Sequence, residues 1–256
     1  MNNFLKRSLT AVVLLALLAV ILYFGGHVLR IAVLLFSLEL CHELSQAFKH
    51  KGHDIPEHYI LLSCFIHFAV FLLSWPAFLA FSVSTFLLVL YYLKSPQFTL
   101  EEFGLCMLIL VYVPYFLFPI LSLEKTFYLY LVFIIAVSTD TFAYLTGMAF
   151  GRHKLVPSIS PNKTVEGAVG AVVCTIIVGL IYCRFVGISI DWMHALFIGV
   201  ASVTAQLGDL FASKMKRATG IKDYGHMLPG HGGFMDRFDS ILMIIPMVYM
   251  LYRFPL

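Results

Sequence analysis

The residues best suited to chemistry gather near the C-terminus of the chain. Only 12% of the 256 residues are charged, yet one short stretch brings together Asp209, Lys214, Lys216, Arg217, Lys222, Asp223, Asp236, Arg237 and Asp239. Carboxylates suit Mg²⁺, which proteins hold through one or two of them plus substrate phosphates, and lysine and arginine bind the phosphates directly. Glycines let backbone approach a phosphate, and the stretch contains Gly220, Gly225, Gly230, Gly232 and Gly233. The combination predicts phosphoryl or nucleotidyl transfer.

Other chemical patterns are missing from the sequence. It has no Walker lysine loop and no GxGxxG followed by a ribose-binding acid. The five cysteines stand singly, without CxxC or Cys/His spacing, and so predict neither a disulfide framework nor a zinc site. The residues suited to hold a metal are Asp209 and Asp236, at the ends of two neighbouring predicted helices.

Long apolar segments must position these residues. With 61% hydrophobic residues and a mean hydropathy of +0.92, the chain is not a soluble domain. Apolar segments of about 20 residues, long enough to span a bilayer, recur along its whole length. The predicted fold is all-α, a polytopic integral membrane protein with about nine transmembrane helices near residues 9–25, 28–48, 58–75, 76–93, 102–123, 126–149, 164–185, 192–213 and 236–254.

The lysines and arginines orient these spans. With the N-terminus in the cytoplasm, 13 of the 17 basic residues fall inside and 4 outside, and an odd number of spans places the C-terminus outside. The first apolar run lacks a small-x-small cleavage site, so we expect a retained signal-anchor helix. We expect residues 1–256 to form a single membrane domain. Its N-terminal helices (1–125) would serve packing, dimer or lipid contacts, and residues 126–256 would supply the catalytic helices and cytoplasmic loops.

The predicted eighth span contains a polar stripe at helical spacing, formed by Ser202, Gln206, Asp209, Ser213 and Lys216. Lipid would not tolerate such a stripe on its own side of a helix. We therefore expect it to face the interior of the bundle or a water-filled cavity.

The predicted sixth span contains Asp140 on one helical face with Tyr144, Gly147 and Gly151. An ionisable residue within a span is a functional hypothesis by default, so we interpret Asp140 as functional. The glycines would also allow close helix packing, which is the alternative explanation for them.

The segment after this span contains Ser160 and Pro161, a good N-cap and first-turn pair, so we expect a helix to begin there. Its free N–H groups would point at the cytoplasmic loop and could bind a phosphate together with Lys163. The alternative is a simple helix start with one positive-inside lysine.

Two acids, Glu39 and Glu43, lie one helical turn apart near the end of the predicted second span. They could line a polar cavity. The alternative, which we favour, is that they are interfacial acids that pair with Lys49 or Lys51.

The C-terminal half resembles a known family. The signature of the phosphatidate cytidylyltransferase (CDP-diacylglycerol synthase) family is matched at its fixed positions by Ser213-x-x-Lys216-Arg217-x₄-Lys222-Asp223-x₅-Pro229-Gly230-His231-Gly232-Gly233-x-x-Asp236-Arg237-x-Asp239. Two upstream segments also resemble blocks of that family: Asp140-Thr-Phe-Ala-Tyr144 and Ser160-Pro161-Asn162-Lys163-Thr164-x-Glu166-Gly167. The resemblance covers roughly residues 135 to 240.

The resemblance implies transfer of CMP from CTP to phosphatidate, which gives CDP-diacylglycerol and pyrophosphate and requires Mg²⁺. A second, monovalent cation is left open. Asp209 and Asp236 would hold the metal. The catalytic residues would be Lys216, Arg217, Lys222, His231 and Arg237. The substrate-binding residues would be Asp140, Asn162, Lys163, Ser213, Asp223, Gly232 and Gly233.

Two other functions stay open at this point. A CTP-dependent lipid kinase would use the same groups to transfer the γ-phosphate. An ion-coupled transporter would use the polar stripe as an ion path, although the charges cluster at the cytoplasmic ends rather than at the midplane. The expected partners are phosphatidate, CTP, the lipid bilayer and a second copy in a homodimer, with no nucleic acid. The expected location is the inner (cytoplasmic) membrane of a bacterium, with the active site on the cytoplasmic side.

Overall fold

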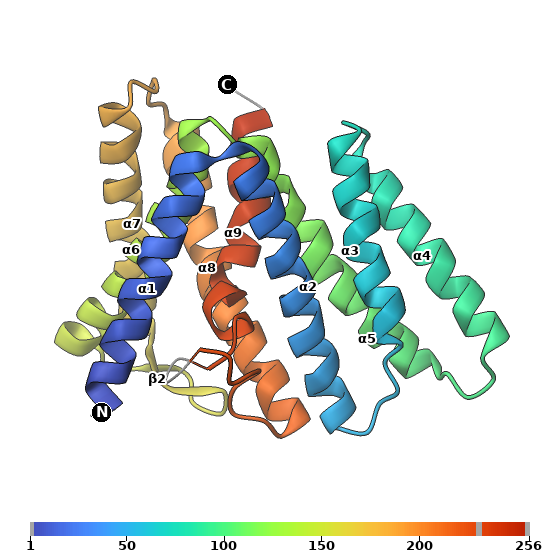
Figure 1. The fold of residues 1–256 in the computed structure, drawn as a ribbon. Helices are drawn as coiled ribbons and strands as arrows, with labels where there is room; N and C mark the ends of the chain where they lie inside the picture. The colour runs from blue at the N-terminus through green and yellow to red at the C-terminus, as the bar shows by residue number, and fades with distance from the viewer. Residues whose placement is uncertain (1–2, 229–231, 254–256) are drawn as a thin grey trace. The chain divides into compact units, whose positions relative to one another are not determined.

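Helices dominate the computed structural model, which describes residues 3–228 and 232–253 (Figure 1). They are α1 Asn3–Phe24, α2 Gly26–His50, α3 Glu57–Leu72, α4 Ala77–Lys94, α5 Leu100–Leu110, α6 Phe127–Phe150, α7 Val165–Phe185, α8 Trp192–Thr219 and α9 Met235–Arg253. After α5 the chain continues through a π-helix, Val111–Tyr115, and a 3₁₀ helix, Phe118–Leu123. Within the described residues, a helix therefore lies in each segment that was expected to span the membrane. Two short strands, β1 Lys154–Val156 and β2 Ser160–Thr164, were not expected.

The chain is a multi-pass membrane protein. In its described part, five helical segments are long and apolar enough to cross a bilayer: Ala77–Lys94, Leu100–Leu123, Phe127–Phe150, Val165–Phe185 and Trp192–Thr219. The apolar helices Val12–Phe24 and Glu57–Leu72 are shorter. The predicted helical, polytopic character is confirmed, whereas the number of spans and the sides on which the termini lie stay predictions.

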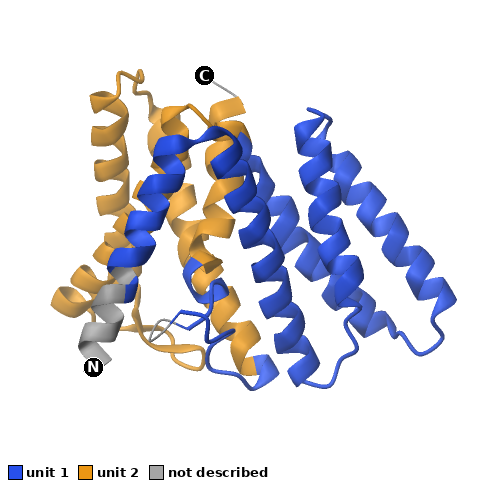
Figure 2. Ribbon diagram, in the orientation of Figure 1, with its two compact units in different colours: residues 1–121, 218–237 blue, residues 122–217, 238–256 orange. Residues whose placement is uncertain are grey.

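The chain divides into two compact units, which Figure 2 distinguishes by colour. Unit 1 comprises residues 1–121 and 218–237, and so joins α1–α5 with the loop that follows α8. Unit 2 comprises residues 122–217 and 238–256, and so contains α6, the two strands, α7, nearly all of α8 and most of α9. The predicted site residues are shared between the units, and each set is described within its own unit.

In unit 1, local signals set the ends of the helices. Thr99 and Glu102 form a capping box at the start of α5: the Thr99 hydroxyl accepts the Glu102 N–H, and Glu102 accepts the Thr99 N–H. Gly25 has a φ of 52°, a left-handed conformation that suits glycine and lets α1 turn directly into α2. The buried core of this unit is built from aliphatic and cysteine side chains, among them Leu40, Cys41, Leu44, Ile60, Cys64, Ile109 and Val113.

In unit 2, α6 and α7 lie side by side at very short range (Figure 1). A Cβ added to Gly167 would lie 2.8 Å from the Ala143 carbonyl oxygen and 3.0 Å from the Gly147 Cα. Small residues allow helices to approach closely in a membrane, where hydrophobic burial supplies no drive between them. The packing interpretation of Gly147 therefore holds.

The strands correct the expected start of α7. Ser160–Thr164 pairs with Lys154–Val156 in an antiparallel hairpin, and α7 begins only at Val165. The N-cap is Thr164, whose hydroxyl accepts the Gly167 N–H at 3.1 Å. The prediction that Ser160 and Pro161 begin the helix was wrong because strand pairing holds this segment extended, which proline tolerates at the edge of a sheet.

Candidate active site

The polar stripe of α8 faces the interior of unit 2, as predicted. Ser202 is fully buried and accepts a hydrogen bond from Thr139 of α6 at 2.9 Å, and Thr139 also lies 3.2 Å from the hydroxyl of Thr175 on α7. One turn further, Gln206 donates to the Ala168 carbonyl oxygen of α7 at 3.2 Å. The stripe therefore joins α8 to both neighbouring helices.

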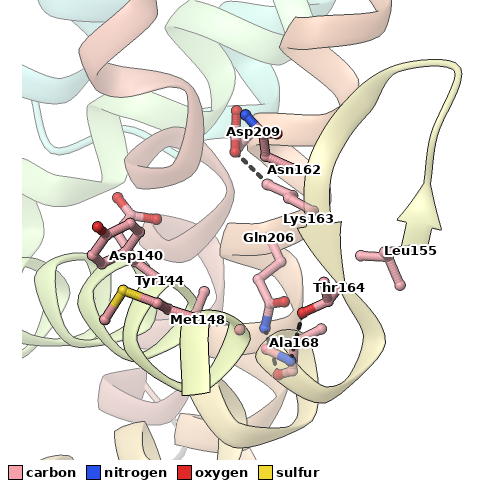
Figure 3. Close-up of a pocket in the computed structure, with 13 residues that line it drawn as sticks. Asp140, Tyr144, Met148, Leu155, Asn162, Lys163, Thr164, Ala168, Gln206 and Asp209 are labelled. Atoms are coloured by element: carbon pink, nitrogen blue, oxygen red, sulfur yellow. Dashed lines mark hydrogen bonds and ion pairs between the residues drawn. The ribbon is translucent and has the colours of Figure 1, made fainter. Parts of the chain in front are cut away.

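Next to this stripe lies a cavity of about 430 Å³, drawn in Figure 3. It lies among α6, β2, α7 and α8. Its lining is formed by Asp140, Ala143, Tyr144, Gly147, Met148, Leu155, Asn162, Lys163, Thr164, Gly167, Ala168, Gln206 and Asp209. The structure thus brings together Asp140, Asn162, Lys163 and Asp209, four of the predicted site residues that come from three separate elements.

The cavity lining combines charged and apolar side chains. Lys163 forms an ion pair with Asp209, and the Ser213 hydroxyl lies 3.4 Å from the same carboxylate. Tyr144 and Met148 lie together on α6 beside Asp140 (Figure 3). A cavity with both characters can accept a charged group and an apolar chain side by side.

A bulge in the hairpin places Asn162 and Lys163 at the cavity. The ladder pairs Lys154 with Thr164 and Val156 with Ser160, so one residue of β1 faces three residues of β2. The two extra residues lie between those pairs and push the strand out of regular register. Bulges redirect side chains and are common next to active sites.

Glu166 organises the turn that leads into this hairpin. Its carboxylate accepts the Arg152 N–H at 3.0 Å and the His153 N–H at 3.2 Å, and it pairs with the His153 ring at 2.6 Å. Glu166 therefore ties the end of α6 to the start of α7 and holds the ends of the hairpin together.

The predicted basic residues on α8 lie at its C-terminal end. Lys216 is half-buried and Arg217 is exposed. Cationic side chains in the last turn of a helix interact favourably with its dipole, so these two residues also suit their place structurally.

The remaining predicted residues belong to unit 1. Lys222, Asp223 and Arg237 are exposed, whereas Asp236 is half-buried at the start of α9. Asp236 Oδ2 accepts the Tyr224 N–H at 2.9 Å and the Gly233 N–H at 3.0 Å, so this side chain closes the loop between α8 and α9. His231 lies outside the described residues.

The glycines of this loop have structural requirements of their own. Gly232 has a φ of 81°, and a Cβ there would lie 2.8 Å from Asp236 Oδ2. Side chains added at Gly225 or Gly233 would overlap with the Glu43 carboxylate of α2. The positive φ therefore favours glycine at position 232, and a side chain at position 225 or 233 would fit only if the Glu43 carboxylate moved away.

The prediction that Glu43 pairs with a nearby lysine was wrong. Glu43 does not pair with Lys49 or Lys51: Lys49 pairs with Glu57 at 2.6 Å, and Glu43 accepts the Phe234 and Met235 N–H groups at 3.0 and 2.7 Å. The partner of Glu43 lies about 190 residues further along the chain, where local helical spacing gives no signal. Glu43 and its neighbours on α2 line a cavity of about 310 Å³ together with the loop, formed by Glu39, His42, Glu43, Gln46, Tyr224, Gly225, His226 and Met227.

Comparison with known proteins decides the family. The model of the cytidylyltransferase family matches residues 5–255. The chain belongs to the cytidylyltransferase family. Phosphatidate cytidylyltransferases of Staphylococcus haemolyticus and Staphylococcus epidermidis are 33% and 35% identical to it, and that of Staphylococcus aureus is 34% identical. Each alignment covers 96% of this chain and 97% of the relative, so the similarity extends over both units.

The two predicted metal ligands belong to different units, Asp209 to unit 2 and Asp236 to unit 1. Asp140 and Asp209 direct oxygen ligands at the cavity of unit 2, next to a lysine suited to phosphate. Among the described residues, no group of three or more His, Cys, Asp and Glu side chains is arranged to hold a metal. A carboxylate such as Asp209 suits Mg²⁺, which is typically held by one or two carboxylates together with water and substrate phosphates.

Proposed function

We propose that the chain is a phosphatidate cytidylyltransferase, which transfers CMP from CTP to phosphatidate. The full-length similarity to enzymes of that name carries the proposal. The cavity of unit 2 supports it, since Lys163 and the carboxylates lie beside the apolar face of Tyr144 and Met148. Such a cavity suits a substrate that has a phosphate at one end and acyl chains at the other.

The reaction needs no nucleophile from the protein, because the lipid phosphate is already an anion. Its oxygen would attack the α-phosphorus of CTP and form a new P–O bond. The bond between that phosphorus and the oxygen bridging to the β-phosphate would break, and pyrophosphate would leave with the electron pair. Catalysis would then rest on positioning and on neutralising charge.

The chain's own residues would divide this work. Lys163, held by Asp209, would bind a phosphate at the cavity, and Asn162 beside it would contribute a neutral donor. Lys216, Arg217, Lys222 and Arg237 would bind the remaining phosphate oxygens. Asp209 and Asp236 are the ligands we propose for Mg²⁺, which would supply positive charge to the triphosphate.

The proposed setting is the cytoplasmic face of a bacterial inner membrane, where CTP is available to an active site that also receives lipid. A homodimer and a second, monovalent cation are further proposals.

The test uses purified protein in mixed micelles with phosphatidate, Mg²⁺ and CTP labelled at the α-phosphate. Wild type is compared with Asp209→Asn, Asp236→Asn and the control Asp54→Asn, whose carboxylate is exposed in the segment between α2 and α3. We expect label in the lipid from wild type and from the control, and loss of that label in the other two variants and on chelation. Label that appears only in soluble CDP would instead show a lipid kinase.

A further inference from the structure

The start of α9 is capped by a side chain from α2. Glu43 is 3% exposed, and its two oxygens accept different backbone groups: Oε1 accepts the Phe234 N–H at 3.0 Å, and Oε2 accepts the Met235 N–H at 2.7 Å. The first N–H groups of a helix have no partner within the helix, and the helix dipole favours a negative charge there. One buried carboxylate therefore accepts hydrogen bonds from two N–H groups. Without it, these groups would be buried without a partner, which costs free energy.

The surroundings of Glu43 are shaped to admit it. Gly225 and Gly233 leave the space that its carboxylate fills, since any Cβ at either position would overlap with it. On α2, Phe36 lies two turns before Glu43 on the same face, and its ring lies 5.6 Å from that of Phe234. The loop and α2 are thus complementary in shape as well as in charge.

A second carboxylate continues this arrangement. Asp236 follows Met235 directly, and its Oδ2 accepts the Tyr224 and Gly233 N–H groups. Glu43 and Asp236 together accept four backbone N–H groups, three from the loop and one from the first residue of α9. Because Phe234 and Met235 are the residues just before Asp236, a shift at Glu43 must move Asp236 and Arg237.

We propose that Glu43 is a positioning residue of the reaction: it fixes the start of α9 and so sets where Asp236 and Arg237 act, without touching substrate itself. This inference rests on the proposed function, in which Asp236 binds the metal and Arg237 a phosphate. Replacing a residue that orients a metal ligand without binding the metal itself typically lowers metal affinity or activity by about 10–100-fold.

The shape of the carboxylate matters as much as its charge. Glutamine keeps the size but has one acceptor oxygen, so its amide group would face an N–H donor and one hydrogen bond would be lost. Aspartate keeps the charge but is one methylene shorter and would not reach both donors from α2. Both variants should therefore loosen the start of α9.

The experiment compares Glu43→Gln and Glu43→Asp with Glu39→Gln, a matched control one turn earlier on α2. Glu39 lines the same cavity as Glu43, and within the described residues it accepts no hydrogen bond. For folded protein we would measure kcat, the KM for CTP and the Mg²⁺ concentration that gives half-maximal activity. We expect Glu43→Gln to lower kcat about tenfold or more and to raise the Mg²⁺ requirement, and Glu39→Gln to stay within about twofold of wild type.

A second readout does not depend on turnover. Hydrogen–deuterium exchange of the peptide over residues 232–240 should become faster in both Glu43 variants and stay unchanged in the control. Unchanged exchange in Glu43→Gln would overturn the proposal, and so would faster exchange with wild-type kcat and Mg²⁺ requirement. An equal loss of activity in Glu39→Gln would also overturn it, because the effect would then belong to the charge of the cavity. Inactive wild-type protein would refute the proposed function, while exchange would still decide whether Glu43 holds α9.

Discussion

The ion pair of Lys163 and Asp209 is the most informative contact at the level of single residues. It joins β2 to α8, two elements about 45 residues apart, and both partners are only partly exposed (25% and 33%). A half-exposed pair of this kind contributes little to stability, because water screens it. The ion pair matters more for position, because Asp209 holds the amino group of Lys163 at the lining of the cavity.

Replacing Lys163 tests that role. We expect Lys163→Met to lower kcat/KM for CTP or phosphatidate by about 10²-fold, the typical loss when one group that stabilises transition-state charge is removed. Lys163→Arg should keep part of the activity, because the positive charge remains. It should not keep all of it, because the planar guanidinium group differs in shape from the ammonium group of lysine.

The matched control for Lys163 is Lys154→Met on β1, which removes an exposed lysine from the same hairpin without changing the cavity lining. Steady-state kinetics at saturating Mg²⁺ give the comparison. If kcat/KM of the Lys163 and Lys154 variants differed by less than about threefold, Lys163 would have no role in the reaction. It would then only contribute to the positive charge on the cytoplasmic side of the membrane.

At the level of elements, the crossing of α6 and α7 depends on the absence of side chains. Gly167 faces the backbone of α6, and Gly170 faces Thr146, where an added Cβ would lie 2.5 Å from the hydroxyl oxygen. The cavity and the hairpin are both attached to this pair of helices. Any change that separates α6 from α7 must therefore alter the site as well as the packing.

A pair of glycine variants tests this crossing. Gly167→Ala should destabilise the protein by about 1–3 kcal/mol, because its methyl group would meet rigid backbone. Gly104→Ala is the control: Gly104 lies in α5 with no neighbouring atom within 4 Å of the new Cβ. Alanine should there stabilise the helix by up to about 1 kcal/mol. Thermal unfolding in detergent micelles measures both, and equal unfolding temperatures would contradict the prediction.

The places of the helices could be predicted from the sequence, because runs of apolar residues and their ends at Gly25 and Pro76 are local signals. The face of α8 that turns inward could also be predicted, since Ser202, Gln206 and Asp209 repeat at helical spacing. The hairpin could not: its pairing depends on hydrogen bonds between residues 154 and 164, and Ser160-Pro161 equally resembles a helix start. The role of Glu43 could not be predicted for the same reason, since its donors lie in another part of the chain.

At the level of the whole molecule, the predicted orientation in the membrane awaits a test. It rests on the 13-to-4 distribution of basic residues and places the loop after α2 in the cytoplasm and the loop after α7 outside. The same orientation would put the hairpin and the loop before α9 on the side where CTP is found.

Two variants, each with one added cysteine, check this orientation. Lys51→Cys follows α2 and Ser189→Cys follows α7, and both native side chains are exposed. The native cysteines lie within helices, four of them buried, so they should react slowly. We expect a membrane-impermeant thiol reagent to label Ser189→Cys on intact cells, and Lys51→Cys only after permeabilisation. The reverse pattern would invert the predicted topology.

The bulge in the hairpin has a consequence for how this chain can vary in length. Because Lys163 leaves the regular ladder and Thr164 then caps α7, the five residues from Lys163 to Gly167 act as a spacer of fixed length between the cavity and the helix. An insertion there would turn the lysine to the other face of the strand. The turn at residues 157–159 lies beyond the ladder pair of Val156 and Ser160, so it can gain or lose residues without moving that lysine. Gaps in the alignment of related chains should therefore fall in the turn and not in the spacer.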